Sequence, residues 1–125
     1  MAETITEDFV SFETAKLLRD KGFDESCEHI YDGDGYLLAN DCGNINADPQ
    51  SEYFCALAPT IQMAVKWFRK VHKIFIVPTM SRNTFLWGYR VLKSDGSTFC
   101  LHANTFNECE DACDAGLKNC SENLI

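Results

Sequence analysis

The sequence predicts an α+β fold in which helices pack on one face of an antiparallel sheet of three or more strands. Residues 58–74 and 104–123 carry apolar side chains at helical spacing, whereas the stretch between them has the alternating pattern of strands and is broken by turn sequences. This gives a C-terminal order α-β-β-β-α, and a helix and a hairpin precede it.

The length of 125 residues favours a single domain, 1–125, because a chain of this size buries roughly two thirds of its unfolded surface without disulfide support. Within it, residues 1–57 form an acidic helix-hairpin-loop portion and residues 58–125 form the α-β-β-β-α core.

The N-terminal helix is predicted from its two ends. Ser11 is a good N-cap, and Gly22 is placed to end the helix in the left-handed conformation. Residues 27–40 then predict a β-hairpin around the Asp-Gly pairs of residues 32–35. Residues 41–57 show no period, so we expect a loop anchored by Tyr53 and Phe54.

The stretch 58–74, APTIQMAVKWFRKVHKI, has the clearest helical pattern in the chain. Pro59 is expected in the first turn, where its missing N–H is no loss. The predicted core face comprises Ile61, Ala64, Val65, Phe68 and Val71, widened by Met63 and Trp67. A polar face with several cations lies opposite.

Three strand-like runs follow the central helix, at residues 74–79, 85–93 and 98–103. The turn sequence Ser94–Ser97 predicts that the last two form a hairpin. Pro78 predicts that the first strand lies at an edge or is bulged there, because proline cannot donate to a ladder. Asn104 or Thr105 is expected to cap the last helix, whose core stripe is Phe106, Cys109, Cys113, Leu117, Cys120 and Leu124.

Net charge is −8, but it is unevenly distributed along the chain. Residues 1–58 sum to −10, residues 59–103 to +6 and residues 104–125 to −4. The acidic ends are expected to neutralise the basic middle on folding, and a long-range field of this sign disfavours free nucleic acid as a partner.

The seven cysteines do not form a metal motif, since the sequence has no C-x-x-C pair. We expect buried, structural thiols and no metal or other cofactor. The acidic start, MAETITEDF, predicts that there is no signal peptide, and no apolar run approaches ~20 residues, so the expectation is a cytoplasmic protein with no membrane contact.

No catalytic motif is present. Cys27 and His29 alternate on a predicted strand and would point to different faces, and the Asp32–Gly35 turn departs from a calcium loop where glycine and glutamate are required. These observations favour a protein that is not an enzyme.

The blocks ITEDFVSFETAKLLRDKGFDE, APTIQMAVKWFRKVHKI and ECEDACDAGLKNCSENLI resemble small uncharacterised proteins carried by prophages and mobile elements of gut Bacteroides-type bacteria. The resemblance covers nearly the whole chain and implies a phage-related accessory protein, with no site residues to transfer. One departure, Phe68-Arg69-Lys70 where the family pattern is Leu-Arg-Glu, makes this helix more basic.

Three functions remain open. The leading one is a non-enzymatic protein-interaction module with an unknown protein partner, and the candidate partner-binding residues are Lys66, Arg69, Lys70, Lys73 and Arg82. The second is a nucleic-acid-associated protein that uses the basic face of the 59–73 helix, although the double-stranded-RNA-binding domain shares only the element order and has the opposite charge on its last helix. The third is an acidic inhibitor that mimics nucleic acid.

Overall fold

The computed structural model describes residues 8–39 and 55–125, apart from the side chains of Cys100 and His102. The elements are α1 (Phe12–Asp20), β1 (His29–Tyr31), β2 (Leu37–Ala39), β3 (Ala56–Leu57), α2 (Ile61–Trp67), η1 (Phe68–His72), β4 (Phe75–Met80), β5 (Trp87–Leu92), β6 (Thr98–Phe106) and α3 (Cys109–Asn123). This is the predicted α+β class.

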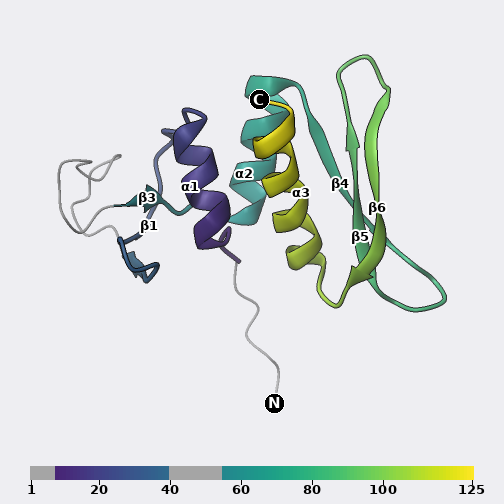
Figure 1. Ribbon diagram of the computed structural model, residues 1–125, viewed down its shortest axis with the longest axis horizontal. Coiled ribbons are helices and arrows are strands. Elements are labelled where there is room, and N and C mark those ends of the chain that lie inside the picture. The colour runs from purple at the N-terminus through teal and green to yellow at the C-terminus, as the bar shows by residue number, and fades with distance from the viewer. Residues whose placement is uncertain (1–7, 40–54) are drawn as a thin grey trace.

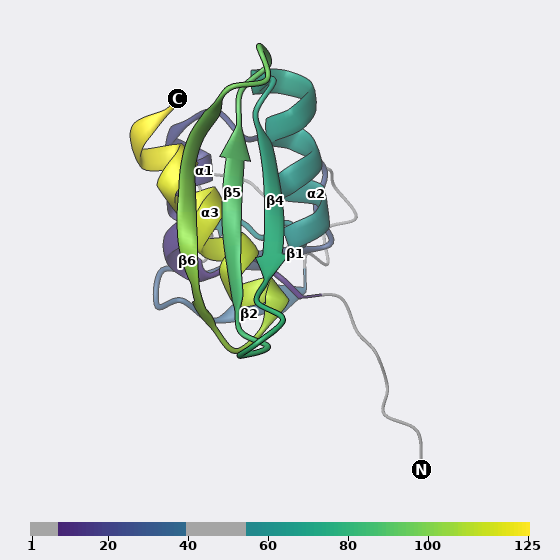
Figure 2. The ribbon, with the colours of Figure 1, turned by 90° about the vertical axis from the view of Figure 1, so that its right-hand side faces the viewer.

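The larger sheet is an antiparallel meander in the order β4-β5-β6, and α2 and α3 both cover one of its faces (Figure 1). Helix α1 packs on α3 on the side away from this sheet. A second, small sheet in the order β2-β1-β3 lies beside α1 (Figure 1). The other face of the larger sheet is open to the viewer in Figure 2.

The register of the larger sheet separates its two faces. Ile76 pairs with Val91, and both are buried, as is Tyr89 opposite Pro78, so these residues face the helices. Pro78 lies on the edge strand β4, as predicted. Helix α3 approaches this face closely at Gly116, where an added Cβ would lie 2.9 Å from Ile76 Cγ2.

One continuous core joins the helices to both sheets. It contains the fully buried side chains of Phe68, Leu18, Leu117, Val10 and Val91, which come from every part of the described chain. The core stripe predicted for the last helix is confirmed, since Cys113, Leu117 and Cys120 are buried.

The ends of α1 are as predicted. The Ser11 hydroxyl accepts a hydrogen bond from the N–H of Thr14 (3.3 Å), and Gly22 follows the helix with φ of 91°. The hairpin of β1 and β2 is also confirmed, with Asp32 Oδ1 accepting from the N–H groups of Asp34 and Tyr36 in the turn.

The starts of two helices differ from the prediction. Helix α2 begins at Ile61 behind the N-cap Thr60, and Pro59 lies before it, fully buried, with its carbonyl accepting from Val10 N (3.1 Å). Pro59 therefore belongs to a strand-like junction, not to the first helical turn. Helix α3 starts at Cys109, because Asn104 and Thr105 extend β6 instead of capping the helix.

The predicted 41–57 loop is also wrong in its last residues. Ala56 and Leu57 form strand β3 and pair with Tyr31 and Ile30 of β1. The rest of that segment, including Tyr53 and Phe54, lies outside the described residues.

Candidate functional site

Helix α2 and the turn η1 bring four of the five predicted partner-binding residues onto one surface. Lys66, Arg69, Lys70 and Lys73, called the basic stripe below, are all exposed. Lys73 ends η1 in the left-handed conformation, with φ of 58°, and its ammonium donates to the carbonyl of Lys70 (3.1 Å). The stripe therefore covers the last turns of the helix and its end.

No carboxylate of the described part forms an ion pair with the basic stripe. The two ion pairs found among residues 8–39 and 55–125 join Arg19 to Asp20 and Lys118 to Glu13. Direct ion pairs therefore do not neutralise the stripe in this part of the chain, and the wider expectation that the acidic ends offset its charge stays a prediction. Unpaired surface cations are available to an external anion at little cost, since nothing has to be displaced.

Arg82 does not join the basic stripe. It lies in the tip of the β4–β5 hairpin, beside Phe85, which is 70% exposed and has φ of 57°. Lys73 precedes β4 and Arg82 follows it, so the six residues of the strand separate them by roughly 20 Å.

A π-helical turn changes the helical face next to the stripe. Five residues, Phe68–His72, adopt this wider geometry, in which each residue advances by a smaller angle than in an α-helix. Val71, predicted to be in the core, is consequently rotated outward and is 54% exposed. His72 takes its place inside, with its ring 4.7 Å from that of Trp67.

A hollow of about 310 Å³ lies between α2–η1 and the segment that follows α1. Trp67 contributes to its wall and is held from behind by Phe23, at 5.2 Å between ring centroids in an edge-on contact. The residues that line the hollow are Glu25, Ser26, Met63, Lys66, Trp67, Lys70 and Val71. Two members of the basic stripe thus flank an apolar hollow, which we call the Trp67 hollow.

A second hollow, of about 660 Å³, lies on the other side of Lys66, where α2 meets β4 and α3. Lys66 and Arg69 line it from α2, and Cys109, Cys113 and Glu110 line it from α3. Burial raises the pKa of both thiols, and that of Cys113 to about 12. A thiol that stays protonated at neutral pH is a poor nucleophile and a poor metal ligand.

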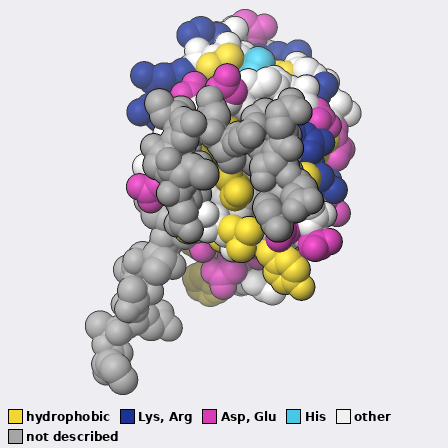
Figure 3. Space-filling view, turned by 90° about the vertical axis from the view of Figure 1, so that its left-hand side faces the viewer, with side chains coloured by type: hydrophobic (Ala, Val, Ile, Leu, Met, Phe, Trp, Pro, Cys, Tyr) yellow, Lys and Arg dark blue, Asp and Glu magenta, His cyan; other side chains and the backbone are white. Residues whose placement is uncertain are grey.

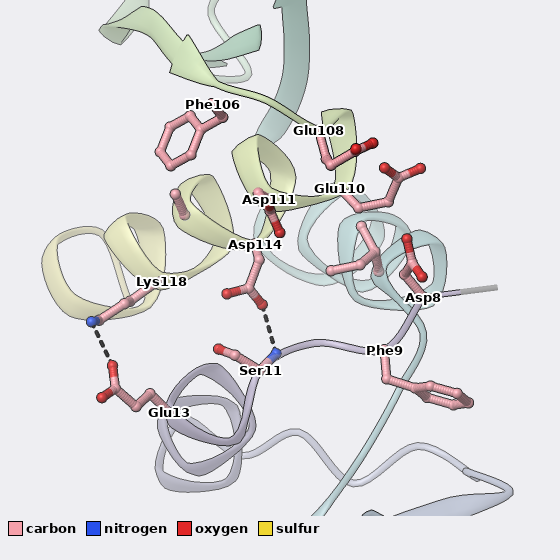
Figure 4. Close-up of a pocket in the computed structure, with 12 residues that line it drawn as sticks. Asp8, Phe9, Ser11, Glu13, Phe106, Glu108, Glu110, Asp111, Asp114 and Lys118 are labelled. Carbon is pink, nitrogen blue, oxygen red and sulfur yellow. Dashed lines mark hydrogen bonds and ion pairs between the residues drawn. The ribbon is translucent and has the colours of Figure 1, made fainter. Parts of the chain in front are cut away.

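The third hollow is an acidic groove between α1 and the first turns of α3 (Figure 4). The carboxylate of Asp114 points from α3 to the start of α1, where it accepts from Ser11 N (2.8 Å) and Thr14 Oγ1 (3.2 Å). Lys118 binds Glu13 at 2.7 Å across the same junction, which lowers the pKa of Glu13 and raises that of Lys118. The groove therefore contains the polar contacts that hold α1 against α3.

Among the described residues, the side chains visible in Figure 3 form no continuous patch of one charge sign. In Figure 3, Lys and Arg side chains stand among Asp and Glu side chains and hydrophobic ones. The described acidic residues of the N-terminal third therefore do not form an unbroken acidic surface in this view.

The described residues offer no group of three or more His, Cys, Asp or Glu side chains that could hold a metal ion. Nor do the described ranges include a helix long and apolar enough to cross a membrane. What this part of the chain does offer is cations beside exposed apolar side chains, an arrangement suited to binding.

Sequence reasoning found the cations but missed Val71 as a surface residue and missed the Trp67 hollow. The 3.6-residue spacing of an α-helix places Val71 on the core face. A π turn, which changes that spacing, has no simple sequence signature. The one signal was His72, a polar residue at a position that is half-buried against Trp67.

Comparison with known proteins adds no relative: no family model matches the chain, and no curated protein or solved structure shows significant similarity to it. The resemblance to proteins of Bacteroides-type prophages stays a prediction.

Proposed function

We propose that this chain is a non-enzymatic protein-interaction module of a phage or mobile element. Its binding surface is the basic stripe together with the Trp67 hollow. The partner presents an acidic segment that carries an apolar side chain, which enters the hollow while carboxylates meet Lys66 and Lys70.

The observation that carries this proposal is the exposure of Val71 among cations that form no ion pair with a described carboxylate. A π turn leaves a β-branched apolar side chain 54% exposed between Lys70 and the end of the helix, at the rim of an apolar hollow. Such turns occur frequently at functional sites. Protein interfaces usually have an apolar centre and a polar rim, and Val71 with its neighbouring cations has this composition.

The size of the hollow supports a side chain as its occupant. A volume of about 310 Å³ is at the lower end of the range for small-molecule sites, ~300–1,000 Å³. It is open to solvent and its wall includes the flexible side chain of Met63. A leucine or phenylalanine of a partner would fit there and would bury Val71 and the edge of Trp67.

The test is affinity capture from a nuclease-treated lysate of a gut Bacteroides-type bacterium, with the full chain as bait. Two changes probe the surface: Val71→Ser removes apolar contact, and Lys70→Gln removes one cation. Their matched controls are Met80→Ser and Arg82→Gln, which make the same chemical changes at exposed positions outside this surface. We expect a defined protein to be captured by the parent and both controls and to be lost, by at least tenfold, with either test variant.

Equal capture by Val71→Ser and the parent would contradict the proposal. Circular dichroism and thermal melting of each variant show whether it is folded, and both test positions are exposed, so we expect them to melt within a few degrees of the parent.

A second candidate function is nucleic-acid association, and the observation that favours it is again the basic stripe, whose cations pair with none of the carboxylates that the structure describes. Four cations in successive turns would follow a phosphate backbone, and binding would fall steeply with salt. Here Val71→Ser should have no effect, whereas Lys70→Gln should reduce the salt slope. Fluorescence anisotropy with a labelled single-stranded and a duplex 20-mer separates the two candidates.

A further inference from the structure

The two edges of the larger sheet are unlike each other. Strand β4 is protected, because Pro78 lacks an N–H and η1 contacts the strand. Strand β6 forms the other edge of the described sheet and runs for nine residues, Thr98–Phe106, without a charged residue or a proline. Its register against β5 shifts on both sides of residues 100–102, so the regular part of this edge is centred on Leu101, and an uncharged edge is a template for pairing with another strand.

The exposed face beside β6 is apolar. Leu101 is 67% exposed, and Phe99 is 38% exposed on the same strand. Leu101 lies opposite Arg90 of β5, whose exposed side chain is therefore on the same, outer face of the sheet. Figure 2 shows that no described element covers this face.

The charges at the two ends of β6 are opposite in sign. At the Thr98 end, the ammonium of Lys93 lies 5.6 Å from the centre of the Phe99 ring, so a cation stands against the strand. At the Phe106 end, the chain continues directly into the exposed carboxylates of Glu108 and Glu110. A strand that pairs with β6 is best matched if it is acidic at one end and basic at the other.

A second copy of this chain meets those requirements. When a strand pairs with itself about a two-fold axis, the pairing is antiparallel, so the Lys93 end of one copy lies beside the Glu108 end of the other. Two such contacts form by symmetry. Because β6 itself is uncharged, no like charges face each other along the strand.

We infer that β6 pairs antiparallel with β6 of a second copy, near Leu101, and joins the two three-stranded sheets into one continuous sheet. The helices of both copies then lie on one side of it. The outer faces join into one apolar surface, with Arg90 of each copy on either side of the two-fold axis.

The first measurement is sedimentation velocity of the full chain under reducing conditions over a range of concentrations up to about 1 mM, since a single added strand pair supports only a weak, micromolar-range dimer. We expect the parent to be dimeric. Leu101→Lys places two like charges across the axis and should raise the dissociation constant at least tenfold. Phe75→Lys is the matched control, because it makes the same type of change on the same face but at the β4 edge.

The second measurement exchanges the charges at the ends of the strand. Lys93→Glu alone places a new carboxylate beside Glu108 of the other copy, and Glu108→Lys alone places a new ammonium beside Lys93 of the other copy. Each of these variants should therefore be monomeric. A mixture of the two variants should form a heterodimer, since both of its end contacts are then between opposite charges, and the double variant should dimerise by itself.

A parent that is monomeric throughout the concentration range would overturn the inference. So would a dimer that Phe75→Lys disrupts as strongly as Leu101→Lys, which would indicate stacking of the open faces, or a mixture of the two charge variants that stays monomeric.

Discussion

At the scale of single residues, Asp114 does more than its position in the sequence predicts. Its place near the start of the last helix suggests a favourable interaction with that helix's own dipole. Instead, its two oxygens bind Ser11 N and Thr14 Oγ1 and so cap a different helix, 100 residues away in the sequence. Thr14 is fully buried, and its hydroxyl accepts from Ser11 Oγ (3.0 Å) and donates to Asp114, so Asp114 is the acceptor for its proton.

We therefore predict that Asp114→Asn destabilises the protein by about 1–3 kcal/mol, the usual cost of disrupting charge-assisted hydrogen bonds to a buried partner. Urea unfolding measures it. Asp111→Asn is the control, because Asp111 is an exposed carboxylate of the same helix, without a hydrogen bond to any described residue. If both variants unfold at the same urea concentration, Asp114 does not hold α1 to α3.

Two buried thiols give a second prediction at this scale. Burial raises the pKa of Cys27 to about 11 and that of Cys113 to about 12, compared with 9.0 for a free thiol. The unfolded state then loses these two protons above pH ~9 while the folded state keeps them, so the contribution of the two thiols to stability is constant below pH ~9 and falls between pH ~9 and ~12.

The measurement is the unfolding free energy of the parent and of Cys113→Ala between pH ~7 and pH ~10.5. The difference between the two proteins should be constant up to about pH 8 and should shrink above pH ~9, because the variant lacks one titrating thiol. A difference that does not change with pH would show that the folded state does not protect the Cys113 proton.

At the scale of elements, Gly116 sets two effects against each other. Glycine in the middle of a helix costs about 1 kcal/mol relative to alanine, so helix propensity alone predicts that Gly116→Ala stabilises α3. However, the new Cβ would lie 2.9 Å from Ile76 Cγ2 and 3.2 Å from Tyr89 Cδ2, and both of these side chains are buried. Overpacking of this kind costs typically about 1–3 kcal/mol.

We predict that packing outweighs propensity and that Gly116→Ala lowers the melting temperature by several degrees. Thermal melting of Glu122→Ala, at an exposed position of α3, gives the effect of an alanine on the helix without a packing change. A Gly116→Ala protein that is more stable than the parent would mean that α3 can move away from the sheet at little cost.

The same scale shows which elements could be predicted. The Ser11 cap, the Asp-Gly hairpin and the edge position of Pro78 follow from local backbone chemistry, and all three are confirmed. Strand β3 has only two residues and depends on pairing with β1, so no local pattern indicates it. The π turn likewise depends on how Trp67 and His72 pack.

The candidate site also combines features that the local sequence predicts with features that depend on tertiary packing. The cations of the basic stripe are recognisable in the sequence, and four of them do lie together because helical spacing brings them there. Their lack of described ion-pair partners, the exposure of Val71 and the Trp67 hollow all depend on tertiary packing. The separation of Arg82 from the stripe depends on the strand that lies between them.

At the scale of the whole molecule, charge is arranged so that the basic stripe and the acidic residues do not pair directly in the described chain. The stripe lies on α2 and η1, whereas Glu13 and Asp114 serve the joint of α1 and α3. A surface charge kept unpaired contributes little to stability, so the stripe is free to change without loss of the fold.

The last prediction tests this with the simultaneous change of Lys66, Arg69, Lys70 and Lys73 to Gln. Each cation loses only a few tenths of a kcal/mol of helix-dipole interaction, and the net charge becomes more negative, so we expect a loss of about 1–2 kcal/mol at low salt that disappears near ~1 M salt. Thermal melting at both salt concentrations measures it. The control is Lys118→Gln, which breaks an ion pair seen in the structure. A loss of several kcal/mol that persists at high salt would mean that carboxylates outside the described residues bind the stripe, and the stripe would then serve the fold and not a partner.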